Sequence, residues 1–333
     1  MLLAALAAIP LGCVGPQHSY GPLPVRNQHP AQLTVMHLDP VPAQPLRAGA
    51  VAGRASFAYT SLFLAGSGHG NSITMDGEVL RSSLQARVGL GNGFEFGAEL
   101  PVLYASGGFL DSFLIDYHGI FGFPDQDRDI APKNQFNVHA DFQGTRVYEL
   151  DDGPMLGDLP LSLTCGIIAP RLGSPGVALR LGAELPTGDA DAGAGNGKTD
   201  FATGLCASWP FSFATLHAAV QYTFTGTPER ARQAGFEFRD VASANAAIEW
   251  PLLDDLAGLV QVEWETSTLR QLDFARAADD QVLLWLGGRL RVDRDLFVEL
   301  SLGEDLAPEV SPDFTAWLAI AWLPGAARGR GAD

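Results

Sequence analysis

The chain has 333 residues, of which 47% are hydrophobic and 18% are charged, and its formal net charge is −17. This length allows one large or two ordinary domains with a sizeable core, and the hydrophobic content excludes a disordered chain. The acidic balance argues against nucleic acid as a partner, because neutralising phosphates requires basic patches.

The N-terminus, MLLAALAAIPLGCVG, is an apolar run that ends in small residues. Such a run is typical of the core of a secretory signal peptide, so we expect residues 1–15 to be an export signal. Leu11-Gly12-Cys13 also looks like a lipoprotein processing box, which makes lipidation of Cys13 the alternative to simple cleavage. No apolar run beyond residue 15 reaches the ~20 residues that a membrane-spanning helix needs. Residues 16–48 then form an N-terminal segment before the first expected strand.

From residue 51 onward apolar and polar side chains alternate, which is the period of a β-strand. In 93–104, for example, Phe94 and Phe96 point to one face and Glu95 to the other, and the preceding Asn-Gly is typical of a hairpin turn. The pattern predicts strands at 51–64, 77–90, 93–104, 159–169, 176–186, 200–209, 212–225, 239–251, 256–268, 280–292, 295–303 and 312–323.

Short turns alternate along the chain with long loops rich in glycine and aspartate, such as 186–200, and this asymmetry is typical of a transmembrane barrel. The apolar faces continue for about 9–12 residues, enough for a tilted strand to cross a bilayer. Most of the tryptophans lie near predicted strand ends, where aromatic girdles occur. We therefore predict an all-β fold, an antiparallel transmembrane β-barrel of about twelve strands within 49–323. It would lie in the outer membrane of a Gram-negative-type bacterium, in contact with its lipid. A secreted sandwich or propeller is the alternative.

Residues 105–158 interrupt the alternating pattern and read as one long insertion. A hairpin is expected at 136–150, and the count rises to fourteen strands if that hairpin joins the barrel wall. Near 108–122 the apolar residues recur instead with helical spacing, which predicts one external helix. This helix is the predicted lid or gate, through Phe109, Asp111, Phe113, Tyr117, His118 and Phe121.

The polar faces of the strands carry charges of both signs, as expected for a barrel interior. These side chains either pair with one another and fill the interior, or line a small pore whose selectivity they set. The predicted lumen-lining residues are Arg81, Arg87, Glu95, Glu99, Arg180, Glu184, Glu263, Glu265, Arg289, Arg291 and Glu299. The segment before the first strand could enter the lumen as a plug, with Arg26 and Asn27 bonding to lumen carboxylates.

Other motifs predict no site. The loop 192–199 fits a relaxed phosphate-loop pattern, but the sequence after it alternates like a strand, whereas that motif requires a helix. Its acidic residues lack EF-hand spacing, and the seven histidines lack paired metal-ligand spacing. Cys165 and Cys206 are expected on opposite faces of their strands, so both should be free. We predict no cofactor, no metal and no enzymatic activity.

Several blocks of the sequence resemble one family. GPLPVRNQHP (21–30), GNGFEFGAELPVL (91–103) and GGFLDSFLIDYHGIFGFP (107–124) resemble the bacterial DUF3187 family of uncharacterised proteins, over nearly the whole chain. The LPTGD block (185–189) is similar to loops of the phenol-degradation MetA-pathway outer-membrane proteins. The resemblance implies an outer-membrane barrel and assigns no activity.

The predicted function is a narrow channel or porin-like transporter for small molecules, hydrophobic ones included. One alternative is a structural barrel whose insertion binds a partner, and another is an outer-membrane enzyme that uses Asp111 and His118. The barrel-insertion machinery is an expected partner, since Trp322 places an aromatic residue at the end of the last strand, before a flexible tail at 324–333.

Overall fold

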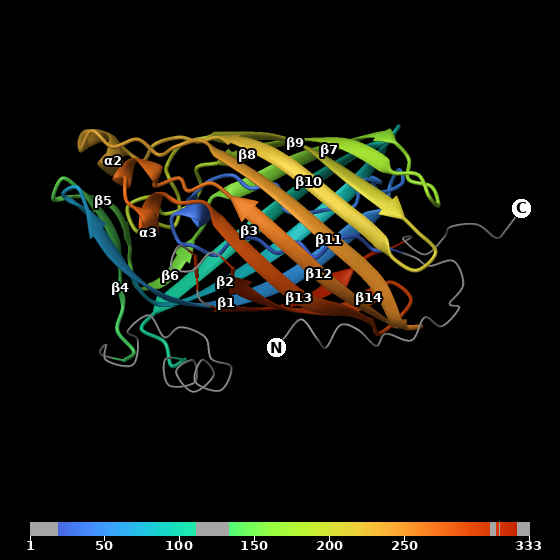
Figure 1. Cartoon of the computed structure of the whole chain (residues 1–333). Coiled ribbons are helices and arrows are strands. Elements are labelled where there is room, and N and C mark those ends of the chain that lie inside the picture. Colours follow the sequence, from blue (N-terminus) through green and yellow to red (C-terminus); the bar gives the residue numbers. More distant parts are fainter. Residues whose placement is uncertain (1–18, 111–132, 307–310, 313, 325–333) are drawn as a thin grey trace, which may run out of the picture.

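Twelve antiparallel strands close into a barrel in the computed structural model, which describes residues 19–110, 133–306, 311–312 and 314–324 (Figure 1). The wall strands are β1 (Val51–Gly68), β2 (Asn71–Gly91), β3 (Phe94–Ser106), β7 (Leu159–Ile168), β8 (Gly176–Leu185), β9 (Asp200–Pro210), β10 (Thr215–Phe224), β11 (Val241–Leu253), β12 (Leu256–Glu265), β13 (Gln281–Arg291), β14 (Leu296–Asp305) and β15 (Phe314–Trp322). The sheet closes because β1 pairs with β15, with Ala58 opposite Trp317. The predicted barrel and its count of twelve strands are confirmed. No helix among the described residues is long and apolar enough to cross a membrane.

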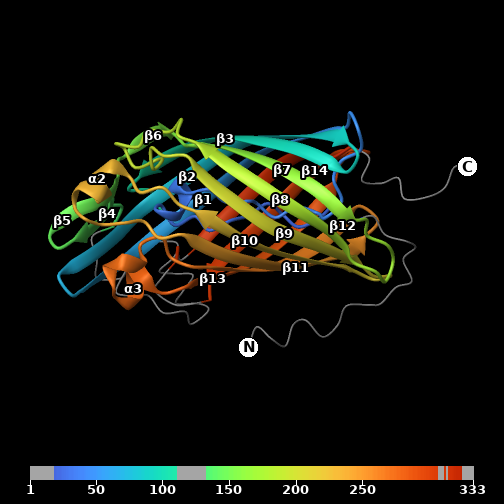
Figure 2. The same cartoon turned by 90° about the horizontal axis from the view of Figure 1, so that it is seen from above.

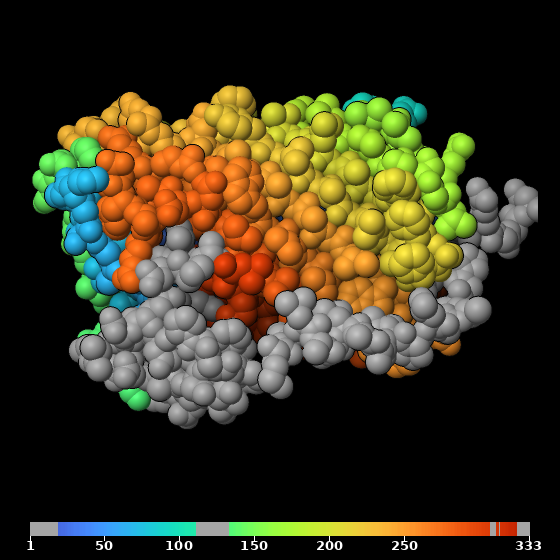
Figure 3. All heavy atoms as spheres, viewed as in Figure 1, coloured from blue at the N-terminus to red at the C-terminus, as the bar shows by residue number. Residues whose placement is uncertain are grey.

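The alternation of side chains gives the wall two different faces. Outward residues such as Leu84 and Val220 are apolar and more than half exposed, at 62% and 55%, whereas inward residues such as Glu263 are buried. Figure 3 shows the side chains of the yellow and orange strands packed closely on one outer face. Trp285 and Trp317 do not belong to an aromatic girdle, since their register positions on β13 and β15 turn both indoles inward, where they are buried.

The two ends of the barrel differ in their connections. Short turns join the strands at one end, which we call the turn end, and long segments join them at the other, the loop end. At the loop end β1 and β2 continue to a tight turn at His69 and Gly70, both with positive φ. The expected strands that ended at 64 and began at 77 were therefore too short, because the residues between them pair as a hairpin beyond the barrel, with Ile73 and Met75 buried in its inner face.

The hairpin expected at 136–150 is present as β4 (Asn137–Phe142) and β5 (Thr145–Leu150). Strand β4 pairs with the outer part of β2, where Thr74 lies opposite His139. The hairpin thus lengthens the sheet above the barrel and does not enter the closed wall, which rules out the alternative of fourteen strands. A further short strand, β6 (Gly153–Leu156), pairs with β3.

A hydrophobic cluster covers the loop end. It combines residues of β4, β5 and the outer parts of β1 to β3 with residues of three short helices in the loops, α2 (Glu229–Gln233), η3 (Arg270–Leu272) and α3 (Ala275–Ala278). Figures 1 and 2 show β4, β5, α2 and α3 gathered at this end. Phe236 is fully buried there, with its ring centroid 5.3 Å from that of Phe142. We call this cluster the cap; its helices were expected only as loops.

We expect Phe236→Ala to loosen the cap and leave the barrel intact. Removing a buried phenylalanine side chain costs about 3–5 kcal/mol through lost burial and the cavity left behind. Trypsin should then cleave the folded variant within 225–240 faster than the parent. Phe213→Ala is the matched control, since Phe213 is 58% exposed at the turn end. Equal cleavage of both variants would show that the cap does not depend on this side chain.

Candidate functional site

The interior of the barrel is occupied by the N-terminal part of the chain, residues 19–50, drawn in blue in Figures 1 and 2. This segment starts at the turn end beside Glu249, reaches the loop end at the short helix η2 (Gln32–Thr34), and returns to the turn end, where Leu46 meets Glu95. Every residue from 21 to 38 is buried. The two limbs touch at Gly21, where φ is +94° and a Cβ would lie 2.6 Å from Pro42. We call residues 19–50 the plug.

Only the end of the plug pairs with a strand among the described residues, where Gly49 N donates to Gly89 O of β2 and Ala50 O accepts from Gly89 N. The backbone N–H groups of residues 19–46 therefore need other acceptors. The wall supplies them from side chains: Gln261 Oε1 accepts from Leu23 N at 2.6 Å, and Gln261 Nε2 donates to Leu23 O at 3.1 Å. The same arrangement recurs from Gly21 N to Glu249 (3.2 Å), Met36 N to Asp200 (3.2 Å), Leu38 N to Gln221 (2.7 Å), Ala43 N to Ser208 (3.0 Å) and Leu46 N to Glu95 (2.9 Å).

Apolar contacts fix the outgoing limb. Leu23 and Val25 belong to one buried cluster with Leu259, Leu283, Trp285 and Trp317 of the inner wall. Gly287 leaves room for this contact, because a Cβ there would lie 2.8 Å from Leu23. The indoles of Trp285 and Trp317 are therefore part of the surface against which the plug rests.

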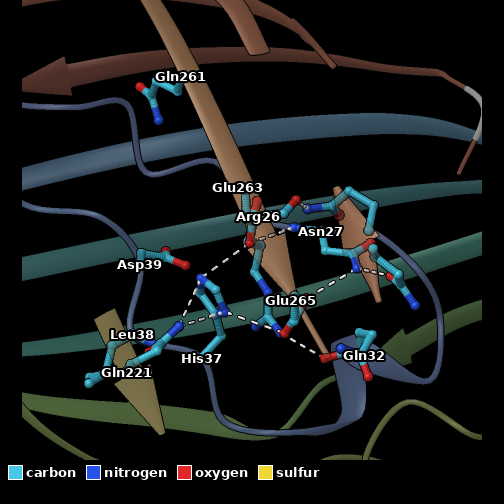
Figure 4. A network of polar contacts seen from close by, with 12 residues as sticks. Arg26, Asn27, Gln32, His37, Leu38, Asp39, Gln221, Gln261, Glu263 and Glu265 are labelled. Carbon is cyan, nitrogen blue, oxygen red and sulfur yellow. Dashed lines mark hydrogen bonds and ion pairs between the residues drawn. The ribbon is translucent and has the colours of Figure 1, made fainter. Parts of the chain in front are cut away.

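Two buried carboxylates of β12, Glu263 and Glu265, face the plug (Figure 4). His37 lies between them, with Nε2 3.7 Å from Glu263 and Nδ1 3.8 Å from Glu265. Asn27 donates its backbone N–H to Glu263 at 3.4 Å and its Nδ2 to Glu265 at 3.1 Å. Among the described residues neither carboxylate is within ion-pair distance of an arginine or lysine, so most of their partners belong to the plug.

The other charged residues of the wall pair mainly with one another. Arg87 lies 3.1 Å from Glu95, Arg81 pairs with Glu99, and Arg289 lies 2.9 Å from Glu249 and 2.6 Å from Glu299. Of the predicted lumen residues, Glu184 and Arg180 are also buried and lack an ion pair in the described part of the chain.

One predicted lumen residue lies elsewhere. Arg291 is at the turn-end rim, where its Nε donates to Asp255 at 2.8 Å, because β13 ends at this residue. Arg54 was not among the predicted lumen residues. It lies three positions before the outward Phe57 on β1, so its side chain points to the opposite, inner face, where it pairs with Glu299 at 2.7 Å. Within the plug, Asn27 bonds to a wall carboxylate, whereas Arg26 donates to backbone carbonyls of the plug itself.

The predicted gate helix falls mostly outside the described residues, including Asp111, Phe113, Tyr117, His118 and Phe121. Phe109 is described: it is 70% exposed, and its ring stacks on Tyr59 at 5.6 Å. The buried Glu78 accepts hydrogen bonds from Tyr59 and from the backbone of Phe109 and Leu110, and so fixes the start of the insertion.

The loop 186–199 is held by carboxylates that bind its backbone. Asp158 accepts from Gly188 N at 2.7 Å and from Asn196 N at 3.1 Å, and burial raises the pKa of Asp158 although these hydrogen bonds oppose the shift. Strand β9 follows directly, so the phosphate-loop pattern lacks its helix. No group of three or more potential ligands that could hold a metal ion occurs among the described residues. Cys165 and Cys206 are both free, as predicted.

The profile of a family described as "Protein of unknown function (DUF3187)" matches residues 5–322. The chain belongs to the DUF3187 family. Among solved structures, the COG4313 outer membrane channel from Pseudomonas putida F1 is similar with a TM-score of 0.55 and 11% identity, over 86% of this chain and all of the other. The NanC porin gives a TM-score of 0.47 at 8% identity, over 82% and 99%. The P. putida toluene transporter TodX gives 0.42 at 10%, over 89% and 93%. No curated protein matches the sequence. The first of these likenesses supports the barrel fold of this DUF3187 protein.

The hydrogen bonds between plug and wall predict a specific pattern of amide exchange. Gln261→Ala removes the acceptor of Leu23 N, and a lost buried hydrogen bond costs about 1–3 kcal/mol. We expect the Leu23 amide to exchange roughly ten- to hundredfold faster in hydrogen-exchange NMR of the protein in micelles. The Leu46 amide, held by Glu95 on the far limb, is the internal control. Unchanged exchange at Leu23 would contradict this anchoring of the outgoing limb.

Proposed function

We propose that this protein is an outer-membrane barrel that forms a narrow channel for small molecules, hydrophobic ones included, and that the plug closes it. The observation that carries the proposal is the composition of the interior: its centre is filled by a separate segment of chain, anchored to the wall by hydrogen bonds and apolar contacts. A segment attached in this way can move without unpairing any strand of the barrel.

The wall charges support this reading. Charged side chains that pair within the wall keep their partners when the plug moves, as Arg87 with Glu95 and Arg289 with Glu299 do. Glu263 and Glu265, in contrast, would lose most of their partners when the plug moves, and a buried charge without a partner is costly. Water entering the emptied lumen would solvate those two carboxylates, so the open state is a hydrated pore.

The interior also offers apolar surface to a solute. Leu23 and Val25 now cover the inner faces of Trp285 and Trp317. A small solute with an apolar body could occupy this surface when the outgoing limb is displaced. The name of the COG4313 outer membrane channel, whose fold this barrel shares, agrees with a channel function.

The exposed apolar face and the asymmetry of the connections give the orientation. We place the turn end in the periplasm and the loop end outside, as is general for such barrels, with the outward leucines and valines against outer-membrane lipid. The chain would reach the membrane through the barrel-insertion machinery, which would recognise the end of β15.

A structural barrel without transport is the competing function, and the cap over the loop end favours it.

Weakening the plug should open the channel. Gln32 clamps the tip of the plug, since its Nε2 donates to Thr266 O at 3.1 Å and its Oε1 accepts from Thr268 N at 2.9 Å. In planar bilayers we expect Gln32→Ala and Asn27→Ala to raise open probability at least tenfold over the parent chain, because the first loses two buried hydrogen bonds and the second loses three. Liposome swelling should rise in parallel for small solutes.

Gln233→Ala is the control for these variants, because Gln233 is an exposed amide whose hydrogen bond stays within α2. Heat-dependent mobility on gels checks that every barrel is folded. If the folded variants neither conduct nor take up solute, the channel is ruled out and the structural function remains.

A further inference from the structure

One buried guanidinium of the barrel wall, within the described part of the chain, lacks the carboxylate partner that the other inward arginines of the wall have. Arg180 points inward from β8 and is 5% exposed. Among the described residues no carboxylate lies within ion-pair distance of it, whereas Arg54, Arg81, Arg87 and Arg289 each have one. Its Nη1 donates to the backbone oxygen of Asp39 at 2.5 Å, and its Nε is buried without a hydrogen-bond partner.

Arg180 faces a cavity of about 50 Å³ between the return limb of the plug and the wall. The lining combines cations with apolar groups: Arg54, Arg87 and Arg180, together with Met36, Val41 and Pro160. Two carboxylates also line it, and each is already engaged: Asp39 accepts from Gln85 at 2.8 Å, and Glu99 pairs with Arg81. Arg54 and Arg87 are likewise paired, with Glu299 and Glu95, so Arg180 is the cation of the lining that has no carboxylate within ion-pair distance in the described part of the chain.

We propose that this cavity is a binding site for a small monocarboxylate with an apolar body, and that Arg180 binds its carboxylate group. The site rests on the proposed channel function and names a class of solute for it. A guanidinium binds a carboxylate with two parallel hydrogen bonds, and the free Nε edge of Arg180 offers such a face. A buried cation and a buried donor without partners are both costly, so an anionic ligand relieves two deficits at once.

The size and polarity of the cavity select the ligand further. A single water needs about 10–15 Å³, so the cavity accommodates a carboxylate group or a few waters. The apolar body would lie along Met36 and Val41. Both residues belong to the plug, so they can move away from the wall together with it. A dianion such as phosphate is disfavoured, because Asp39 and Glu99 line the same cavity.

The same guanidinium connects ligand binding to the plug. Its Nη1 donates to the backbone oxygen of Asp39 on the return limb, while its Nε edge is free for the ligand. A carboxylate bound at Nε would therefore lie directly beside an anchor of the plug.

The test is isothermal titration calorimetry of the full chain in detergent micelles with benzoate and butyrate, and with benzyl alcohol and benzylamine as neutral and cationic analogues. We expect benzoate and butyrate to bind, and benzyl alcohol and benzylamine to bind at least tenfold more weakly. Arg180→Gln should weaken benzoate binding at least tenfold, with Arg180→Lys in between because it keeps the charge and loses the planar fork. Arg291→Gln, at the exposed rim, should bind benzoate as the parent does.

Three results would overturn the site: no binding of either acid, equal binding of benzoate and benzyl alcohol, or unchanged benzoate affinity in folded Arg180→Gln. Binding in micelles does not require transport, so the two proposals fail separately. A protein that binds benzoate through Arg180 but never conducts loses only the channel. A conducting protein whose benzoate affinity ignores Arg180 loses only this site.

Discussion

The backbone of residues 19–46 imposes the central constraint on this molecule. An extended chain inside a closed barrel finds no free strand edge, and every buried N–H without an acceptor is costly. The wall meets this demand with inward side chains, from Glu249 and Gln261 on the outgoing limb to Gln221 and Ser208 on the return limb. The spacing of acceptors on the strands thus determines the path of the plug, and the plug in turn explains why the interior is so rich in carboxylates and amides.

The interior charges form two groups with different dependence on the plug. Pairs such as Arg87–Glu95 lie within the wall and stabilise it in any state of the lumen. Glu263 and Glu265 contact His37 and accept hydrogen bonds from Asn27, so in the proposed channel these contacts would favour the closed state. His29 adds no charge to this balance, since burial lowers its pKa to about 4 and the imidazole is neutral at pH 7. In the proposed channel, closure would thus depend on the contacts that the plug makes with these two carboxylates of β12.

The period of two in the sequence predicted which side chains of each strand face the lumen. The partners of these side chains depend on how the strands are aligned with one another, and they could not be predicted. Alternation alone places Glu95, Glu263 and Glu299 inside, because inward and outward positions follow from a period of two. It does not say which arginine meets which glutamate, because Arg54 and Glu299 lie on β1 and β14, which are not adjacent. For the same reason no pattern could single out Arg180 as unpaired. The inward position of Trp285 follows from its register and not from a general preference of tryptophan for girdles. The outer hairpin of β1 and β2 was missed although Ile73 and Met75 alternate there, because glycine and small polar residues dominate around its turn.

The plug and the cap are not independent closures. Ala31, Leu33 and Val35, at the tip of the plug, belong to the same buried cluster as Phe236 and Leu272 of the cap. Moving the tip toward the turn end removes apolar surface from the cap, and loosening the cap removes the surface on which the tip rests. Each event lowers the cost of the other, since both expose parts of one hydrophobic cluster. If the plug moves as proposed, a displacement of its tip would therefore also loosen the cap at the loop end, because one cluster is buried by both.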